Sequence, residues 1–221
     1  MQTAQPCQMS AYGSIGGGGQ GVARFLEVLI NQLPQTLSDG TEVEVVELER
    51  GSAEAHAACD LLNRELAGGM SYPQFGPLDE DAFSAYYLSH DALCMRRRAD
   101  KFFMGSVYIK PNFPGRSGHI CNGGFIVHES VRGIGVGSLL AKYFMALAPM
   151  LGFEAVFFNL VFADNEPSLR IWKKLGFQHV GTITQAAKKS DGSGYQDAFQ
   201  MYYRFTSNHT SVTDKQSARH T

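Results

Sequence analysis

A glycine-rich segment, residues 131–138, constrains the fold of this chain more than any other part of the sequence. It reads Val-Arg-Gly-Ile-Gly-Val-Gly-Ser and has glycine at every second position from Gly133 to Gly137. The segment follows an apolar run, residues 125–127, and precedes apolar residues at helical spacing, which predicts a strand, a short turn and a helix. Because alternate glycines leave the N-terminus of that helix bare of side chains, its main-chain N–H groups can bind an anion of pyrophosphate size.

Arg132 lies beside these glycines and can clamp the same anion through charge-assisted hydrogen bonds. The alternative is a plain glycine-rich turn next to a solvated arginine, because a short glycine motif is weak evidence by itself. A second segment favours anion binding. Residues 165–177 read Asn-Glu-Pro-Ser-Leu-Arg-Ile-Trp-Lys-Lys-Leu-Gly-Phe, in which the first asparagine can open a short helix and the Gly-Phe pair can end it.

The pattern Arg132-x-x-Gly135-x-Gly137, together with the segment that begins at Asn165, resembles the two signatures of the GNAT N-acetyltransferases. The resemblance implies acetyl-CoA as the co-substrate and no metal. It also implies a cofactor site composed of Phe125, Val127, Arg132, Gly133, Gly135, Gly137 and Asn165. No Cys–His pair is placed to form an acyl-enzyme, so we expect direct attack by the amine in a ternary complex.

Asn165 is the candidate catalytic residue. Its amide can cap the helix that follows and can also donate a hydrogen bond to the leaving sulfur of the thioester. The family usually has a tyrosine seven residues after this asparagine, as the proton donor to sulfur, whereas this chain has Trp172. The usual proton donor is therefore absent, and Asn165 or water would have to stabilise or protonate the leaving sulfur.

Shorter segments resemble one branch of the family, the fungal L-azetidine-2-carboxylate N-acetyltransferases, which act on proline analogues. These segments are Ser-Tyr-Pro-Gln (residues 71–74), Tyr-Ile-Lys-Pro-Asn (108–112), Cys-Asn-Gly (121–123), Ala-Pro (148–149) and Phe-Asn-Leu-Val-Phe (158–162). The branch resemblance implies that the acceptor is a small amino or imino acid such as azetidine-2-carboxylate.

Two uncharged amides, Asn122 and Asn159, interrupt strands that are otherwise apolar. Each can be a structural hydrogen-bonding group or a substrate contact, and the branch resemblance favours substrate contact. The main-chain N–H groups of Asn159 and Leu160 can then receive the acceptor's carboxylate. We expect this site to use neutral donors only, because a buried ionic partner costs desolvation energy.

Two other functions stay open. An N-acetyltransferase of protein lysines or polyamines should show an acidic groove, whereas the acidic residues of this chain are scattered. A non-catalytic acyl-CoA-binding regulator on the same fold is compatible with the absent tyrosine, although no nucleic-acid-binding module is evident.

Charge and cysteine content exclude several classes of protein. The chain has 221 residues and a formal net charge of −2, which argues against binding to nucleic acid or to an acidic membrane. Its four cysteines lie far apart and have no histidine at metal-ligand spacing. We expect a cytoplasmic protein, with a mitochondrial location as the alternative because acidic residues are absent before Glu27. The sequence leaves the oligomeric state open, with a homodimer as one possibility.

The pattern of apolar residues predicts one α+β (mixed α/β) domain over residues 21–205, between a disordered glycine-rich tail (1–20) and a disordered polar tail (206–221). The expected helices cover 22–33, 52–69, 80–88, the run after 137, and 167–175. The expected strands cover 43–48, 102–110, 119–127, 154–162, a segment near 180, and 198–204. Gly123 and Gly124 should mark a bulge or a close backbone approach. The resemblance implies the GNAT fold, a mixed and mostly antiparallel sheet flanked by helices and splayed at that bulge.

Overall fold

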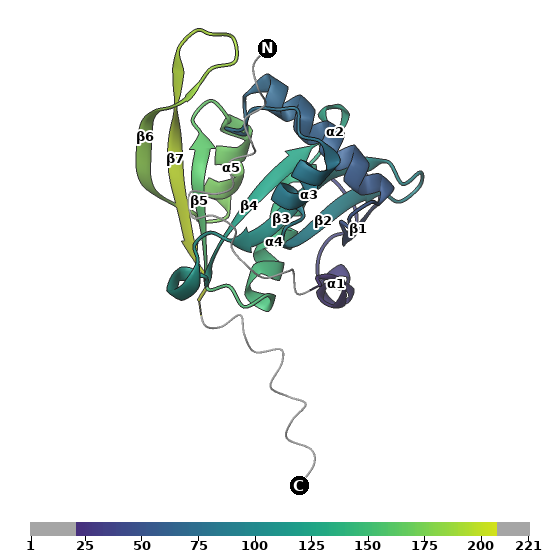
Figure 1. Ribbon diagram of the computed structural model, residues 1–221. Helices are drawn as coiled ribbons and strands as arrows, with labels where there is room; N and C mark the ends of the chain where they lie inside the picture. Colours follow the sequence, from purple (N-terminus) through teal and green to yellow (C-terminus); the bar gives the residue numbers. More distant parts are fainter. Residues whose placement is uncertain (1–20, 207–221) are drawn as a thin grey trace.

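The computed structural model describes residues 21–206, so the two predicted tails lie outside it apart from residue 206. One sheet of seven strands has the order β1-β2-β3-β4-β5-β7-β6 (Figure 1). The strands are β1 (Val43–Glu47), β2 (Asp91–Arg97), β3 (Phe103–Pro111), β4 (Ile120–Val127), β5 (Ala155–Phe162), β6 (Gln178–Lys188) and β7 (Tyr195–Arg204). All neighbouring strands are antiparallel except β4 and β5. The predicted α+β class and mixed sheet are confirmed.

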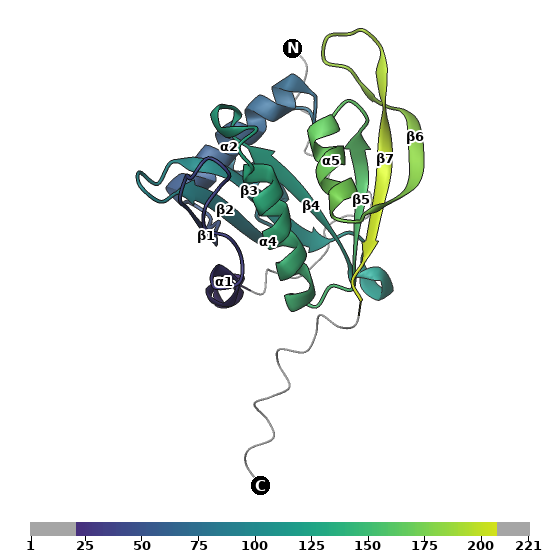
Figure 2. The same ribbon diagram turned by 180° about the vertical axis from the view of Figure 1, so that it is seen from behind.

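Helices cover both faces of the sheet. They are α1 (Ala23–Ile30), α2 (Ala53–Gly68), α3 (Glu80–Tyr87), α4 (Val136–Met150) and α5 (Glu166–Lys174), with short 3₁₀ turns at Gly115–Ser117 and Glu129–Val131. The helices α2 and α3 cover the face seen in Figure 1, whereas α1 and α4 cover the face seen in Figure 2. None of these helices is long and apolar enough to cross a membrane, within the residues that the structure describes.

Strand β2 is an element that the sequence pattern did not predict. Its residues alternate between the two cores: Leu93 and Met95 pack towards α1 and α4, whereas Ala92 and Cys94 pack towards α2 and α3. A strand buried on both faces reads as a continuous apolar run and not as an alternation. The short run here ends in three arginines, which resembled a solvated segment.

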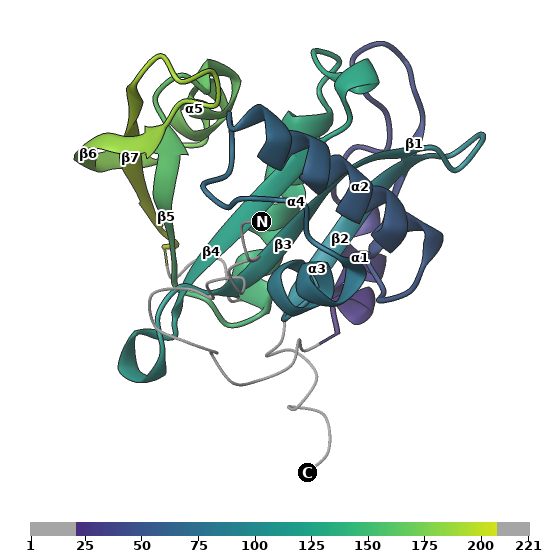
Figure 3. The ribbon, with the colours of Figure 1, turned by 45° about the horizontal axis from the view of Figure 1, so that its top comes forward.

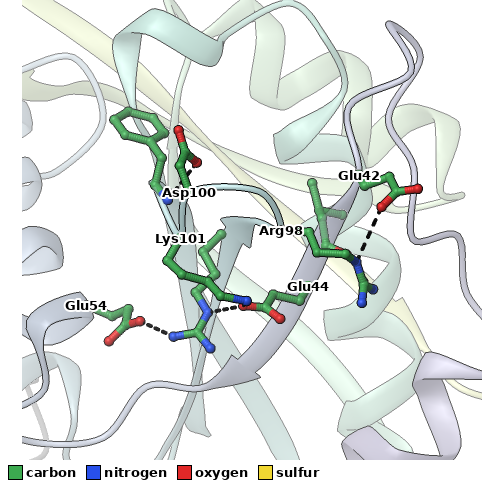
Figure 4. A network of polar contacts seen from close by, with 9 residues as sticks. Glu42, Glu44, Glu54, Arg98, Asp100 and Lys101 are labelled. Carbon is green, nitrogen blue, oxygen red and sulfur yellow. Dashed lines mark hydrogen bonds and ion pairs between the residues drawn. The ribbon is translucent and has the colours of Figure 1, made fainter.

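Three consecutive arginines at residues 96–98 read in the sequence as solvated charges, but the structure shows otherwise for Arg96, whose side chain is only 24% exposed. Its guanidinium bridges Glu44 of β1, at 2.5 Å, and Glu54 at the start of α2, while Lys101 Nζ lies 2.8 Å from the Glu44 carboxylate (Figure 4). Burial opposes ionisation of both carboxyls, but hydrogen bonds from Lys101 and Arg96 to Glu44, and from Arg96 to Glu54, outweigh it and lower the pKa of each. This network joins the edge of the sheet to α2.

The strands β4 and β5 pair only at their beginnings, where Ile120 faces Ala155 and Cys121 faces Val156. Beyond these pairs the two strands diverge (Figures 1 and 3). The register shift lies in β5, between Phe158 and Val161. The predicted splay at a bulge is therefore present, but the bulge belongs to β5 at residues 159–160 and not to the glycine pair.

Gly123 and Gly124 stay in register with β3, opposite Ile109 and Tyr108. Their role is close approach, the other predicted alternative. A Cβ atom on Gly123 would lie 2.5 Å from the ring of Phe144 in α4, and one on Gly124 would overlap the ring of Tyr108. Phe144 of α4 therefore packs directly on the backbone of Gly123, and Tyr108 packs on that of Gly124, close to the point where the strands separate.

Candidate active site

The predicted anion-binding loop lies at the N-terminus of α4. Gly133 and Gly135 have φ angles of +84° and +104°, which favour glycine, and Gly135 is the N-cap of the helix. Leu139 N donates to Gly135 O at 2.9 Å. The N–H groups of residues 136–138 lie in the first turn, where an α-helix provides no carbonyl partner, and they point out of the helix end. The geometry fits a cradle for a phosphate or pyrophosphate group.

Arg132 lies at the start of this loop, but its guanidinium already has two partners. It forms an ion pair with Glu65 of α2, and its Nε donates to Val127 O at 3.2 Å. A second, exposed pair, Arg64 with Glu129 at 3.4 Å, also joins α2 to the loop. These two pairs line a surface pocket, together with Gly68 and Met70. Glu65, which the sequence did not single out, therefore fixes where the Arg132 side chain lies.

The carbonyl groups of Phe125 and Val127 both have donors within the protein. The Tyr72 hydroxyl donates to Phe125 O at 3.1 Å, and Arg132 Nε donates to Val127 O. Burial raises the pKa of Tyr72 well above its ordinary value, so this hydroxyl stays protonated. In an antiparallel pair, the N–H and C=O of one residue point to the same side of the strand. The N–H groups of Phe125 and Val127 therefore face the splay, where a cofactor arm can pair with them.

Trp172 packs between the diverging strands as part of the core. Its ring centroid lies 5.0 Å from that of Phe125 in β4 and 4.5 Å from that of Phe158 in β5. The indole Nε1 donates to Ser168 Oγ at 2.7 Å, and the side chain is buried. Its single N–H is therefore engaged, so Trp172 does not replace the absent tyrosine as a donor to sulfur.

Asn165 is the N-cap of α5, as predicted. Its Oδ1 accepts from Ser168 N at 3.3 Å, and its Nδ2 donates to Ser71 Oγ at 3.3 Å. Because Ser71 follows α2 in the chain, this bond links α5 to the segment between α2 and α3. One N–H of the Asn165 amide makes the bond to Ser71, and a side-chain amide carries two. A donor role towards sulfur is therefore compatible with the capping role.

The two predicted acceptor residues, Asn122 and Asn159, meet through a third asparagine. Asn112 Oδ1 accepts from Asn122 Nδ2 at 3.2 Å and from Asn159 Nδ2 at 2.7 Å, and Asn112 Nδ2 donates to Asn159 Oδ1 at 3.0 Å. Asn122 Oδ1 also accepts from Gly123 N at 2.8 Å. We call Asn112, Asn122 and Asn159 the asparagine cluster. It spans β4 and β5 where they begin to separate, and Leu160 follows it in the bulge of β5.

Asn112 is the member of this cluster that the sequence did not single out. It lies directly after β3, the residue is only 6% exposed, and its side chain is hydrogen-bonded to both other amides. A side-chain amide carries two N–H donors and one oxygen, so the three amides together supply more donors than their own contacts use. Such a cluster suits an anionic ligand. Among residues 21–206 the structure has no group of three His, Cys, Asp or Glu side chains that could hold a metal ion.

Comparison with known proteins identifies related chains. Residues 55–177 match the acetyltransferase (GNAT) family. N-acetyltransferase aca1 of Schizosaccharomyces pombe is 47% identical over 104 residues, which is 47% of this chain and 50% of that protein. YwnH of Bacillus subtilis, provisionally named a phosphinothricin acetyltransferase, is 36% identical over 125 residues, 57% of this chain and 64% of YwnH. The chain thus spans about half to two thirds of the length of these relatives.

A solved structure shows the same fold. The GCN5-related N-acetyltransferase from Kribbella flavida superposes with a TM-score of 0.68 at 25% sequence identity. The superposition covers 74% of this chain and 98% of that one. The sheet with its splayed parallel pair and flanking helices is therefore the GNAT fold.

Proposed function

The chain belongs to the acetyltransferase (GNAT) family, and from this premise we propose that it transfers the acetyl group of acetyl-CoA to the nitrogen of a small amino or imino acid. Proline analogues such as azetidine-2-carboxylate are the acceptors that we infer. The observation that carries this proposal is the asparagine cluster, which gathers neutral amide donors at the splay between β4 and β5. The anion-binding loop at the N-terminus of α4 follows β4, and Arg132 of that loop donates to Val127 O at the end of the strand.

The residues at the loop fit the anionic part of acetyl-CoA. Positive φ angles at Gly133 and Gly135 turn the main chain so that it presents N–H groups and no side chain. Arg132 lies at the start of the same loop, where its ion pair with Glu65 fixes its guanidinium. The N–H groups of Phe125 and Val127 face the splay and suit the amide groups of the pantetheine arm.

Acetyl transfer then needs a neutral amine aimed at the thioester carbon. The acceptor nitrogen forms a bond to that carbon, the carbon–sulfur bond breaks, and the proton that the nitrogen loses passes through water to the thiolate, which leaves as the free thiol of coenzyme A. Asn165 donates an amide N–H to the sulfur as negative charge develops there. Asn122 and Asn159, with the N–H groups of Asn159 and Leu160, orient the acceptor and its carboxylate. Names of relatives support a small amine: YwnH is named for acetylation of phosphinothricin.

The experiment that tests this function measures release of free thiol from acetyl-CoA with single acceptors. We expect release with azetidine-2-carboxylate and formation of the N-acetyl product by mass spectrometry. Release only with spermidine or a lysine peptide would favour the first alternative, acetylation of polyamines or proteins. Tight binding of acetyl-CoA with no release for any acceptor would favour the non-catalytic regulator.

Asn165 can be tested so that capping and catalysis separate. Asn165→Ala should lower kcat about tenfold or more and change acceptor KM little, because the proposed hydrogen bond strengthens as charge develops on sulfur. Asn165→Ser is the matched control, since serine also caps helices well but lacks the amide donor. Recovery of both Tm and kcat in the serine variant would show that Asn165 acts only as a cap.

Asn112 can be tested as the residue that positions the other two amides. Asn112→Leu keeps a similar side-chain shape but removes the oxygen that receives hydrogen bonds from both Asn122 and Asn159. This loss should destabilise the protein by about 1–3 kcal/mol. We expect acceptor KM to rise about tenfold, because the amides lose their fixed orientation, while the Kd for acetyl-CoA stays the same. A lower Tm with unchanged acceptor KM would assign Asn112 a purely structural role.

A further inference from the structure

Lys110 lies beside the asparagine cluster on the face of the sheet covered by α2 and α3. Lys110 in β3 faces Asn122 in β4, two residues along from the pair of Tyr108 with Gly124. Side chains of directly opposed residues point to the same face, with Cβ atoms roughly 4.5–5.5 Å apart. Since Tyr108 packs in the core under α2 and α3, Lys110 and Asn122 share that face.

The ammonium group of Lys110 is held by fixed aromatic groups. Its Nζ lies 4.3 Å from the ring centroid of Tyr86 in α3 and 4.4 Å from that of Tyr108, and it donates to Tyr86 O at 3.1 Å. The hydroxyl groups of Tyr86 and Tyr108 are hydrogen-bonded to each other at 3.1 Å. The half-buried lysine therefore keeps its charge on the same face of the sheet as Asn122, its partner in β4, at little cost in side-chain freedom.

We propose that Lys110 supplies the positive charge of the acceptor subsite and selects amines that carry a carboxylate. The inference rests on the proposed function and names the specificity determinant of that site. Neutral amides can orient a carboxylate, but they do not balance its charge when it leaves water. A fixed ammonium nearby compensates for that loss, and it repels the second positive charge of a polyamine or of a lysine-rich peptide. This proposal adds a charged group to the neutral donors that the sequence led us to expect.

The same charge favours the reactive form of the acceptor. A neighbouring cation lowers the pKa of an amine, so that more of the acceptor nitrogen is neutral and able to attack. At His90, which precedes β2, burial first, and then the charge of Lys110, lower the pKa of the imidazole.

The test compares two acceptors that differ only in the carboxylate, azetidine-2-carboxylate and azetidine-2-carboxamide. The preference of the wild-type protein is the ratio of their kcat/KM values. Lys110→Met keeps an unbranched apolar stem against the two tyrosine rings but removes the charge. We expect this variant to reduce the preference for the carboxylate about tenfold or more. Lys110→Arg, which keeps the charge, should retain most of it.

A measurement on the wild-type protein makes the test independent of how the variants fold. Added salt should raise KM for the carboxylate more than for the carboxamide, because only the first carries a charge opposite to that of Lys110. An unchanged preference for the carboxylate in folded Lys110→Met would overturn the role of Lys110, and so would an equal effect of salt on the KM of both acceptors. Neither result would contradict the proposed function. If the wild-type protein acetylates spermidine and neither azetidine compound, the proposed function itself is wrong.

Discussion

Replacing Gly135 with valine should abolish measurable binding of acetyl-CoA, a loss of about a hundredfold or more. Gly135 has a φ angle of +104° at the N-cap of α4, and valine is strained there by about 1–3 kcal/mol. Among the described residues, a Cβ atom would meet Ser38 Oγ at 4.0 Å, so the folded chain has room for it. We expect the branched side chain to fill space that the bound anion needs. Isothermal titration calorimetry with acetyl-CoA measures the effect.

A matched control separates backbone strain from loss of the anion site. Gly152, after the C-terminal end of α4, has a φ angle of +89°, and nothing lies within 4 Å of an added Cβ atom. Gly152→Val therefore carries similar strain away from the loop and should keep wild-type affinity for acetyl-CoA. Arg132→Ala should weaken binding by about 1.5–3 kcal/mol through the lost charge-assisted contact. Wild-type affinity in both Gly135→Val and Arg132→Ala would show that the glycine segment is only a turn.

Replacing Asn122 with alanine should reduce kcat/KM for azetidine-2-carboxylate about a hundredfold or more, with the Kd for acetyl-CoA unchanged. The substitution removes the proposed contact with the amine substrate. It also removes one of the two hydrogen bonds to Asn112 Oδ1 and the oxygen that accepts from Gly123 N at 2.8 Å. Lost bonds of this kind cost about 1–3 kcal/mol of stability. Steady-state kinetics and a thermal melt on the same preparation measure both effects.

Asn122→Asp is the control for this prediction. Its carboxylate keeps an oxygen for Gly123 N, so the main chain of β4 stays supported, but it lacks the N–H donor and repels an acceptor carboxylate. We therefore expect a loss of activity at least as large as in the alanine variant. The Tm should also fall, because the second carboxylate oxygen meets Asn112 Oδ1 where the amide donated a hydrogen bond. Activity close to that of the wild type in Asn122→Asp would contradict a substrate contact through this amide.

Local features of the sequence predicted the parts of the site that depend on local structure. Alternate glycines at 133–137 predicted the bare N-terminus of α4, since main-chain conformation and helix ends are set by adjacent residues. Asn165 was predicted as an N-cap for the same reason and is one. Asn122 and Asn159 were recognised because single amides interrupt apolar strands, and the structure brings them together.

Contacts between distant segments could not be predicted in this way. Asn112 reaches Asn159 across 47 positions of sequence, so nothing near residue 112 marks it as buried. Arg96 looked solvated because its partners, Glu44 and Glu54, come from another strand and a helix. Lys110 is part of a motif that the sequence did show, but its cation–π contacts depend on how α3 packs over β3. The same holds for Glu65, which reaches Arg132 from α2.

The central claim, that this acetyltransferase fold acts on a small carboxylate-bearing amine, is tested most directly by competition in one mixture. The wild-type protein is given acetyl-CoA with equal concentrations of azetidine-2-carboxylate, proline, spermidine and a lysine peptide, and the acetylated products are quantified by mass spectrometry. Product ratios in such a mixture report the ratios of kcat/KM. We predict that N-acetylazetidine-2-carboxylate is the main product, ahead of N-acetylproline, because the family branch that the sequence resembles acts on proline analogues. Acetylspermidine or acetylated peptide as the main product would contradict the claim.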